Sequence, residues 1–243
     1  MYISSTNSTN SLAKELLAKG EWPQTERYVY AGYQTAGRGQ TGNGWESEEN
    51  KNLLCSIVLP PRQNLFELNV VVAVAVRRVL GEDFTIKWPN DIYWQDKKVA
   101  GILIENAIIG NELNYSIAGI GLNVNQTEWK TDAPNPVSLK QITGQEYNIY
   151  ELMQRLDVEV QKALKEAVWA EYKAHLYRRE GFWPFVEREV STAPTMNVQS
   201  NKVQGTKVFM AQIKDVLPTG EIMLIDEKNQ ERKYHFKQIR YVV

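Results

Sequence analysis

The sequence predicts an α/β protein in which helices cover a mixed β-sheet, followed by a small all-β domain. Strand-like and helix-like segments alternate over roughly the first 180 residues, which is typical of an α/β domain. Apolar residues at positions 152, 156, 160, 164 and 168 form one stripe, as expected of a helix that covers a sheet face. From Asn197 to Val243 the pattern is strand-like, with turn residues and no helical stripe.

The first elements follow from start and stop signals along the chain. Residues 8–11 offer N-caps to a helix that stops before Gly20, and Gly81 closes a valine-rich helix. A glycine-rich loop runs to Trp45 between two strands. These elements are a helix over 12–18, a strand over 28–33, a buried strand over 53–59 and a helix over 65–79.

The second half of the α/β region contains a short strand, a hairpin and the striped helix. Pro89 ends the strand over 84–88, and Gly110-Asn111 marks a hairpin that joins 99–105 to 113–124. The pattern of the sequence changes at residues 191–195, Ser-Thr-Ala-Pro-Thr. We therefore expect a main domain over residues 1–190 and a small β-barrel domain over residues 191–243.

Composition excludes several classes of protein and of site. The chain has 243 residues, 43% of them hydrophobic, so a core can form without disulfides. Its single cysteine, Cys55, lies in an apolar strand and is interpreted as a packed core thiol. The net charge of -1 and the lack of charge blocks indicate no nucleic-acid interface. No signal peptide or membrane span is evident, so we expect a soluble, cytoplasmic protein.

The glycine-rich loop admits three interpretations. Gly37, Gly39 and Gly42 match the dinucleotide-binding pattern G-x-G-x-x-G, but that motif requires a helix to begin within it. Here the loop continues to Trp45 without a helical period. Bare backbone amides beside Arg38 favour a loop that orders over an anionic ligand. A long, flexible hairpin connection remains the structural alternative.

A second polar segment follows the strand that ends at Pro89. Asn90 and Asp91 are expected on a loop at the strand end, where α/β sheets commonly bind ligands, although an ordinary polar turn would look the same. Gly101 would allow close backbone approach. In the segment over 119–125, Asn123 and Asn125 would share one strand face, with glycines clearing space beneath them.

The residue inventory indicates anion chemistry. His175 and His235 lie in unpromising settings, so there is no Ser-His-Asp candidate, and no zinc spacing exists. What remains is a lysine, an arginine, backbone amides, one aspartate and several asparagines. That set suits the stabilisation of negative charge on phosphates.

Five short strings follow one another along the chain: Ser8–Asn10, Tyr33–Gly39, Lys87–Asp91, Lys98–Glu105 and Gly119–Asn125. In order, spacing and identity they resemble the biotin protein ligase family. The segment after residue 197 resembles that family's small SH3-like domain, so the resemblance covers essentially the whole chain. It implies the biotin/lipoate ligase type of catalytic fold.

The resemblance implies an ATP-dependent ligase of two steps. Biotin and ATP, with Mg²⁺, would form biotinyl-5′-AMP, and a lysine of a biotin carboxyl carrier domain would then take the biotinyl group. Lys98, Arg38 and Asp91 would be the catalytic residues, with Asp91 a candidate base for the carrier lysine. The family includes monomers and dimers, so a homodimer is compatible with the resemblance.

The resemblance also assigns binding residues by matching positions. Biotin would be held by Ser8, Thr9, Asn10, Gln34, Gly37, Arg38, Gly39, Gln40, Lys98 and Gly101. The nucleotide would be held by Arg38, Gln40, Trp45, Asn90, Lys98 and Asn123. Asp91 or Asn123 would be candidates for the metal that accompanies ATP.

Two departures from the family pattern stand out. Gln40 and Asn43 occupy positions where many relatives have arginine, which puts in doubt how tightly the loop retains the adenylate. The chain begins close to Ser8, so we expect a stand-alone ligase without the helix-turn-helix domain of bifunctional relatives, and no DNA binding.

Two other functions remain open at this stage. A lipoate or octanoate ligase or transferase shares the Lys87–Asp91 string, but a plain acyl chain has no ureido ring for Ser8, Thr9 and Asn10 to bind. A sensor that binds biotin or nucleotide without catalysis would release no pyrophosphate.

Overall fold

The structure is a computed structural model that describes residues 1–40, 43–62, 64–109, 112–130, 135–188 and 207–242. It divides into two compact units, Met1–His175 and Leu176–Val243.

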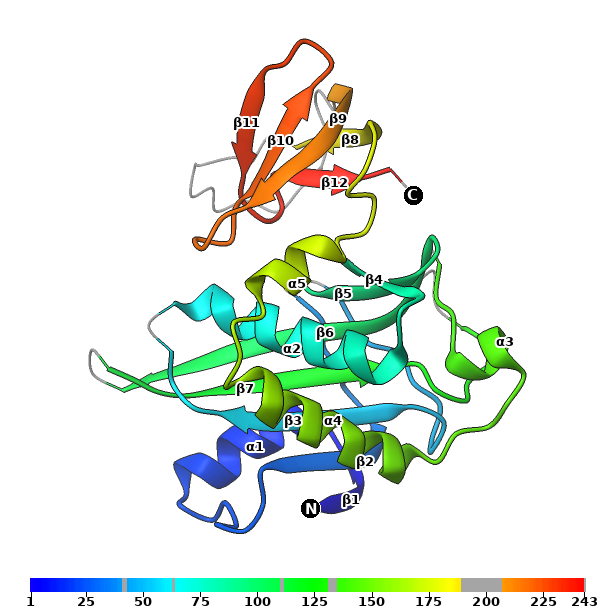
Figure 1. Cartoon of the computed structure of the whole chain (residues 1–243). Coiled ribbons are helices and arrows are strands. Elements are labelled where there is room, and N and C mark those ends of the chain that lie inside the picture. Colours follow the sequence, from blue (N-terminus) through cyan, green and yellow to red (C-terminus); the bar gives the residue numbers. More distant parts are fainter. Residues whose placement is uncertain (41–42, 63, 110–111, 131–134, 189–206, 243) are drawn as a thin grey trace, which may run out of the picture. The chain divides into compact units, whose positions relative to one another are not determined.

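The first unit is built on a seven-stranded mixed sheet (Figure 1). Its order is β1-β2-β3-β7-β6-β5-β4, with β1 parallel to β2 and every other pair antiparallel. This confirms the predicted α/β class with a mixed sheet. The strands are β1 (Tyr2–Thr6), β2 (Tyr28–Gln34), β3 (Leu53–Leu59), β4 (Phe84–Lys87), β5 (Asp91–Trp94), β6 (Lys97–Ile109) and β7 (Glu112–Leu122).

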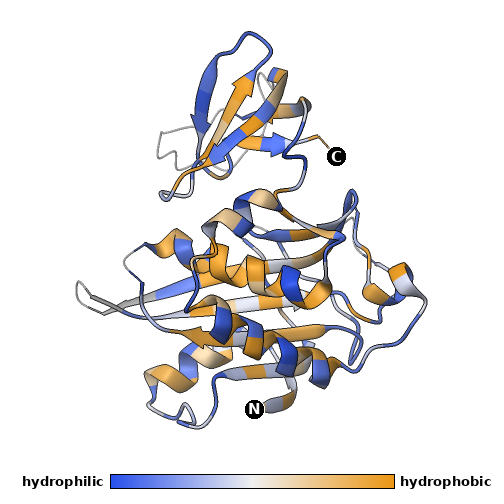
Figure 2. Cartoon of the chain, in the orientation of Figure 1, coloured by the Kyte–Doolittle hydropathy of each residue, from blue (hydrophilic) through white to orange (hydrophobic). Residues whose placement is uncertain are grey.

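Helices cover both faces of this sheet. α2 (Leu65–Leu80) and α4 (Ile149–Ala163) lie side by side on one face, and α1 (Thr9–Ala18) packs on the other (Figure 1). Alternation along β3 separates the two faces, because Ser56 contacts α1 while its neighbour Cys55 points toward α4. Figure 2 shows α2 as mostly hydrophobic, in keeping with the burial of ten of its residues. Two short helices, α3 (Leu139–Thr143) and α5 (Trp169–Ala174), complete the unit.

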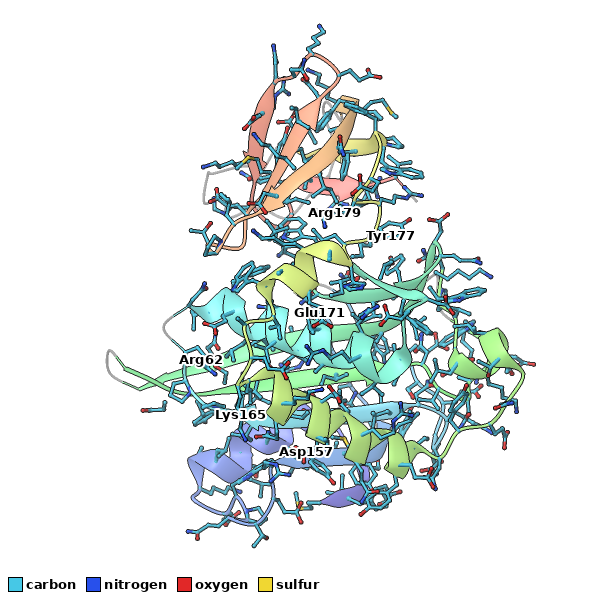
Figure 3. The ribbon with its side chains drawn as sticks, viewed as in Figure 1. Arg62, Asp157, Lys165, Glu171, Tyr177 and Arg179 are labelled. Carbon is cyan, nitrogen blue, oxygen red and sulfur yellow. The ribbon has the colours of Figure 1, made fainter. Side chains whose placement is uncertain are left out.

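Ion pairs fasten the helical layer. Asp157 of α4 is buried and accepts from the Nε of Arg27 at 3.0 Å. Glu171 of α5 accepts from the Nε of Arg78 of α2 at 2.9 Å, and this hydrogen bond lowers the pKa of Glu171. Figure 3 labels Asp157 and Glu171 on their helices. The helices that cover the sheet are therefore held by directional contacts as well as by apolar packing.

The second unit is an antiparallel five-stranded sheet in the order β11-β10-β9-β8-β12. Its core includes the rings of Phe185 and Tyr241, whose centroids lie 4.9 Å apart. The predicted all-β C-terminal unit is thus present and compatible with an SH3-like domain, although no pairing among the described strands closes the sheet into a barrel. The strands are β8 (Trp183–Glu187), β9 (Lys207–Val216), β10 (Ile222–Asp226), β11 (Glu231–Tyr234) and β12 (Ile239–Tyr241).

The two units divide earlier than residue 190. β8 pairs with β9 and β12, so its hydrogen bonds assign it to the second sheet. The change of sequence pattern predicted to separate the domains, at residues 191–195, lies outside the described residues, as does the Gly110-Asn111 turn.

Some local predictions are wrong in detail. The helix expected to reach Val168 ends at Ala163, where Leu164 caps it, and Val168 stays buried because it precedes α5 in the same layer. Asp91 was expected on a loop but begins β5, which pairs with β4 in a tight hairpin. Asn123 and Asn125 lie beyond the end of β7 and not on the strand.

In the described part of the chain, no helix is long and apolar enough to cross a membrane.

Candidate active site

The candidate site lies on the sheet face that α1 covers, where the helix N-terminus, the glycine-rich loop and β3, β6 and β7 meet. The helix begins with three buried polar residues, Ser8, Thr9 and Asn10. Ser8 is the N-cap by backbone conformation, but its side chain makes no capping hydrogen bond. The Ser8 side chain therefore does not cap the helix.

Gln34 is oriented by Thr9. Its Oε1 accepts from the backbone N–H of Thr9 at 2.8 Å and lies 3.1 Å from the Thr9 hydroxyl. A backbone N–H can only donate, so the oxygen of the Gln34 amide must face Thr9. The Nε2 of Gln34 faces the other way, near Gly37. The amide therefore offers a hydrogen-bond donor away from α1.

Asn10 fills the space above Gly119. Its Nδ2 donates to Glu105 at 2.7 Å and to the carbonyl of Leu103 at 3.3 Å, and its Oδ1 accepts from Ser56 at 2.6 Å. A methyl group added at Gly119 would lie 2.5 Å from that Oδ1. Gly119 does clear space, but Asn10 occupies it, because a side chain from α1 reaches across the sheet.

Trp45 rests on the other pair of glycines. Gly101 and Gly121 face each other across β6 and β7. A methyl group at Gly121 would lie 2.7 Å from the indole Nε1, and one at Gly101 would lie 3.0 Å from Cζ3. The room that Gly101 was expected to leave for a ligand therefore holds the Trp45 ring in this structure. We call the Gly101–Gly121 pair the glycine shelf.

Lys98 and Asp91 form an ion pair beside the glycine shelf. The Lys98 Nζ lies 2.8 Å from Asp91 Oδ1, and 5.6 Å from the centroid of the Trp45 ring. The carbonyl of Lys98 accepts from the Nδ2 of Asn123 at 3.3 Å. The structure thus brings together Lys98, Asp91 and Asn123, which the sequence places up to 32 positions apart.

Arg38 is held beside Ser11 and Glu105, on the exposed side of the site. Its guanidinium donates to the Ser11 hydroxyl at 2.9 Å and lies 3.4 Å from the Glu105 carboxylate, with 47% of its side chain exposed. Burial alone would raise the pKa of Glu105, but hydrogen bonds from Lys14 and Asn10, together with the charges of Lys14 and Arg38, lower it. Arg38 is therefore a cation with surface still free to meet an anionic ligand.

Glu105 gives the site a predictable response to acid. Because its folded pKa is lowered, its ionised form stabilises the fold above the usual glutamate pKa of about 4.3, and that contribution is lost as the pH falls through the lower folded value. We expect Glu105→Gln to lower the melting temperature at pH 7 and to cost progressively less at more acidic pH. Melting curves of both proteins between pH 7 and pH 3 check this. A constant difference over that range would contradict it.

The glycine-rich loop folds back on itself. Gly39 N–H donates to the Asn43 carbonyl at 2.8 Å, and the Nε2 of Gln40 donates to Asn90 Oδ1 at 3.2 Å. β3 is the next element after the loop, and no helix begins among the loop residues that the structure describes, so the dinucleotide-binding interpretation is wrong. Gly42 lies outside the described residues. The neutral Gln40 thus anchors the loop to the turn between β4 and β5.

Three buried polar atoms in this region have no hydrogen-bond partner among the described residues: Gln40 Oε1, Trp45 Nε1 and Asn123 Oδ1. Buried polar groups in proteins are nearly always paired, so each such atom requires an explanation. All three belong to residues assigned to the nucleotide by the resemblance. Their clustering is the feature expected where a polar ligand completes the hydrogen bonding.

Ser56 and Glu105 carry contacts that the sequence did not assign to the site. Ser56 is the one hydroxyl in an apolar strand, which was the available signal. Cys55 is buried, and burial raises the pKa of its thiol, in line with a core thiol. No cluster of three or more potential metal-binding side chains occurs among the residues that the structure describes.

The first half of the chain matches a protein family. Residues 2–123 match the model of the biotin/lipoate A/B protein ligase family, which is half of the sequence. The chain belongs to this family. Every residue of the candidate site lies within the matched segment.

Biotin ligases are among the relatives of this family member. It is 38% identical over 133 residues to the bifunctional ligase/repressor BirA of Bacillus subtilis, covering 52% of this chain and 40% of that protein. It is 32% identical over 158 residues to the biotin--[acetyl-CoA-carboxylase] ligase of Paracoccus denitrificans, covering 58% of this chain and 63% of that one. The chain thus spans about half the length of the curated relatives it matches.

The fold also matches solved structures over the full chain. The biotin protein ligase of Aquifex aeolicus in complex with biotin and ATP aligns with a TM-score of 0.76 and 23% identity, covering 100% of this chain and 98% of that one. At this identity the match establishes the fold, including the biotin ligase type of catalytic sheet followed by a small β unit.

Proposed function

We propose that this protein is a biotin protein ligase, which activates biotin as biotinyl-5′-AMP and transfers the biotinyl group to a lysine of a biotin carboxyl carrier domain. One observation carries the proposal: a polar cradle, made of the buried Thr9 and Asn10 and the half-buried Gln34, lies on the same sheet face as two cations, Arg38 and Lys98. A polar ring and an anionic group are the two ends of biotin. The named relatives support the same choice.

The first step requires two anions to meet. A carboxylate oxygen of biotin attacks the α-phosphorus of ATP, the new O–P bond forms, and pyrophosphate leaves with the electrons of the broken bond. Lys98 and Arg38 lower the repulsion between carboxylate and phosphate. Mg²⁺ enters as part of the ATP substrate, and the Asp91 carboxylate and Asn123 Oδ1 are oxygen donors of the kind it prefers.

The second step forms an amide. The neutral amine of the carrier lysine attacks the acyl carbon of the mixed anhydride, and AMP leaves. Asp91 is our candidate for the group that takes the amine proton. Its carboxylate can accept a proton, and it lies beside the ammonium of Lys98, where the reacting groups would be bound. We propose that the reaction takes place in the cytoplasm.

The orientation of Gln34 favours biotin over lipoate or octanoate. The ligand meets an amide N–H at Gln34 and therefore needs an acceptor there, such as a ureido carbonyl. A saturated acyl chain would leave that donor and its neighbours buried without partners.

The substrate is tested by offering biotin, lipoate and octanoate separately, each with Mg²⁺-ATP and a carrier domain. We expect one biotinyl group added to the carrier, seen by mass spectrometry, with release of pyrophosphate. Omitting ATP, or replacing the carrier lysine with arginine, should prevent the modification. Transfer of lipoate or octanoate in place of biotin would overturn the proposal, and so would biotin binding without pyrophosphate release.

A further inference from the structure

The hydroxyl of Ser56 lies beneath the polar cradle and holds two of its members. Ser56 is 0% exposed, sits on β3 opposite Gly119, and has its Oγ 2.6 Å from Asn10 Oδ1 and 2.8 Å from Thr9 Oγ1. A fully buried hydroxyl cannot reach a ligand itself. The Ser56 hydroxyl has one proton and two oxygen neighbours, so it can donate a hydrogen bond to only one of them at a time.

The direction of that proton follows from the far end of Asn10. The groups that face its amide nitrogen are the Glu105 carboxylate and the Leu103 carbonyl, and both can only accept. Asn10 Oδ1 must then face Ser56, and an amide oxygen can only accept. The Ser56 proton is therefore donated to Asn10, and the Ser56 Oγ turns a lone pair toward Thr9.

The Thr9 hydroxyl is fixed in turn. Its proton has two acceptors, Ser56 Oγ and Gln34 Oε1, and both lie within the protein. The Thr9 hydroxyl therefore donates its proton to a neighbour within the protein. Only the lone pairs of its oxygen are left to accept a hydrogen bond from a ligand. The neighbouring Gln34 presents an N–H. The cradle offers an acceptor beside a donor, the complement of an N–H next to a C=O.

We propose that Ser56 is a positioning residue that sets the direction of the hydrogen bonds in the cradle, so that Thr9 accepts from the ligand and Gln34 donates to it. The proposal rests on the proposed function, because a cyclic urea such as the one in biotin presents this N–H and C=O pair. Ser56 acts through Thr9 and Asn10 and touches no substrate.

Ser56→Ala tests the role with little change in volume. The substitution leaves Asn10 Oδ1 without its donor and removes one of the two internal acceptors that hold the Thr9 proton, so the Thr9 hydroxyl is less firmly oriented. We expect the dissociation constant for biotin, measured by calorimetry without ATP, to rise about tenfold. The KM for biotin should rise by a similar factor, while kcat at saturating biotin stays within about threefold, since the reacting groups are untouched.

Ser116→Ala is the matched control. Ser116 is also 0% exposed, on the adjacent strand β7, and its hydroxyl bonds Asn106 Oδ1 at 2.7 Å, away from the cradle. It should lose a similar amount of stability and keep wild-type affinity for biotin. Equal losses of affinity in the two variants would overturn the positioning role, as would wild-type affinity in Ser56→Ala.

A double-mutant cycle with Thr9→Val identifies the route. If Ser56 acts through Thr9, adding Ser56→Ala to Thr9→Val should weaken binding by much less than tenfold. Fully multiplicative losses would contradict that route. A wild-type protein that binds biotin but releases no pyrophosphate would overturn the proposed function and leave this test intact; one that does not bind biotin would overturn both.

Discussion

Replacing Lys98 with alanine should abolish adenylate formation and leave the fold intact. Lys98 places its ammonium beside Asp91 and above the edge of the glycine shelf, on the sheet face where carboxylate and phosphate would meet. Removing a preorganised charge from such a site costs about a hundredfold to a thousandfold in rate. Two anions would then have to approach with one fewer cation, so we expect the loss at the upper end of that range.

The measurement is pyrophosphate release with biotin and Mg²⁺-ATP, before any carrier is added. Lys97→Ala is the matched control, because Lys97 is the adjacent, exposed lysine. It should keep wild-type turnover. Lys98→Arg should restore little activity, since a planar guanidinium does not place charge at the Nζ position. Near wild-type pyrophosphate release by Lys98→Ala would disprove the assignment.

Lys98 is an example of a site residue that could be predicted from the sequence only in part. Its strand and its match to the family string were available from local pattern, as were the long helix over 65–80 and the buried strand of Cys55. The strand β1 was missed because three of its five residues are small and polar, and β5 was missed because its first residue, Asp91, follows Pro89-Asn90 in what resembles a polar turn. Asp91 was consequently expected on a loop, although its partnership with Lys98 depends on the β5–β6 pairing.

Contacts within the site depend on register between distant strands. The register of β6 and β7 sets Gly101 opposite Gly121, and only then does a shelf exist for Trp45. Likewise, Ser56 meets Asn10 from 46 positions away, and Glu105 meets Lys14 from 91 positions away. A one-residue slip in register would turn these side chains to the other face, so periodicity alone could not have located them.

Gly121→Ala should dislodge Trp45 and slow the proposed adenylate formation. The added methyl would lie 2.7 Å from both Cζ2 and Nε1 of the indole and closer still to Cε2, distances at which atoms must move. Overpacking of this kind typically costs about 1–3 kcal/mol of stability. The loop segment that carries Trp45 would no longer pack beside Lys98. We therefore expect kcat/KM for adenylate formation to fall about tenfold or more.

A graded series and a compensating variant separate this steric cause from a general loss of stability. Gly101→Ala should be milder, because its methyl would meet Trp45 at 3.0 Å and otherwise the flexible end of Lys98. In a Trp45→Ala background the obstructing ring is gone, so adding Gly121→Ala should reduce kcat/KM by little. Melting temperatures and pyrophosphate release for the four proteins of this cycle provide the measurement. If Gly121→Ala costs as much without the indole as with it, the shelf does not act through Trp45.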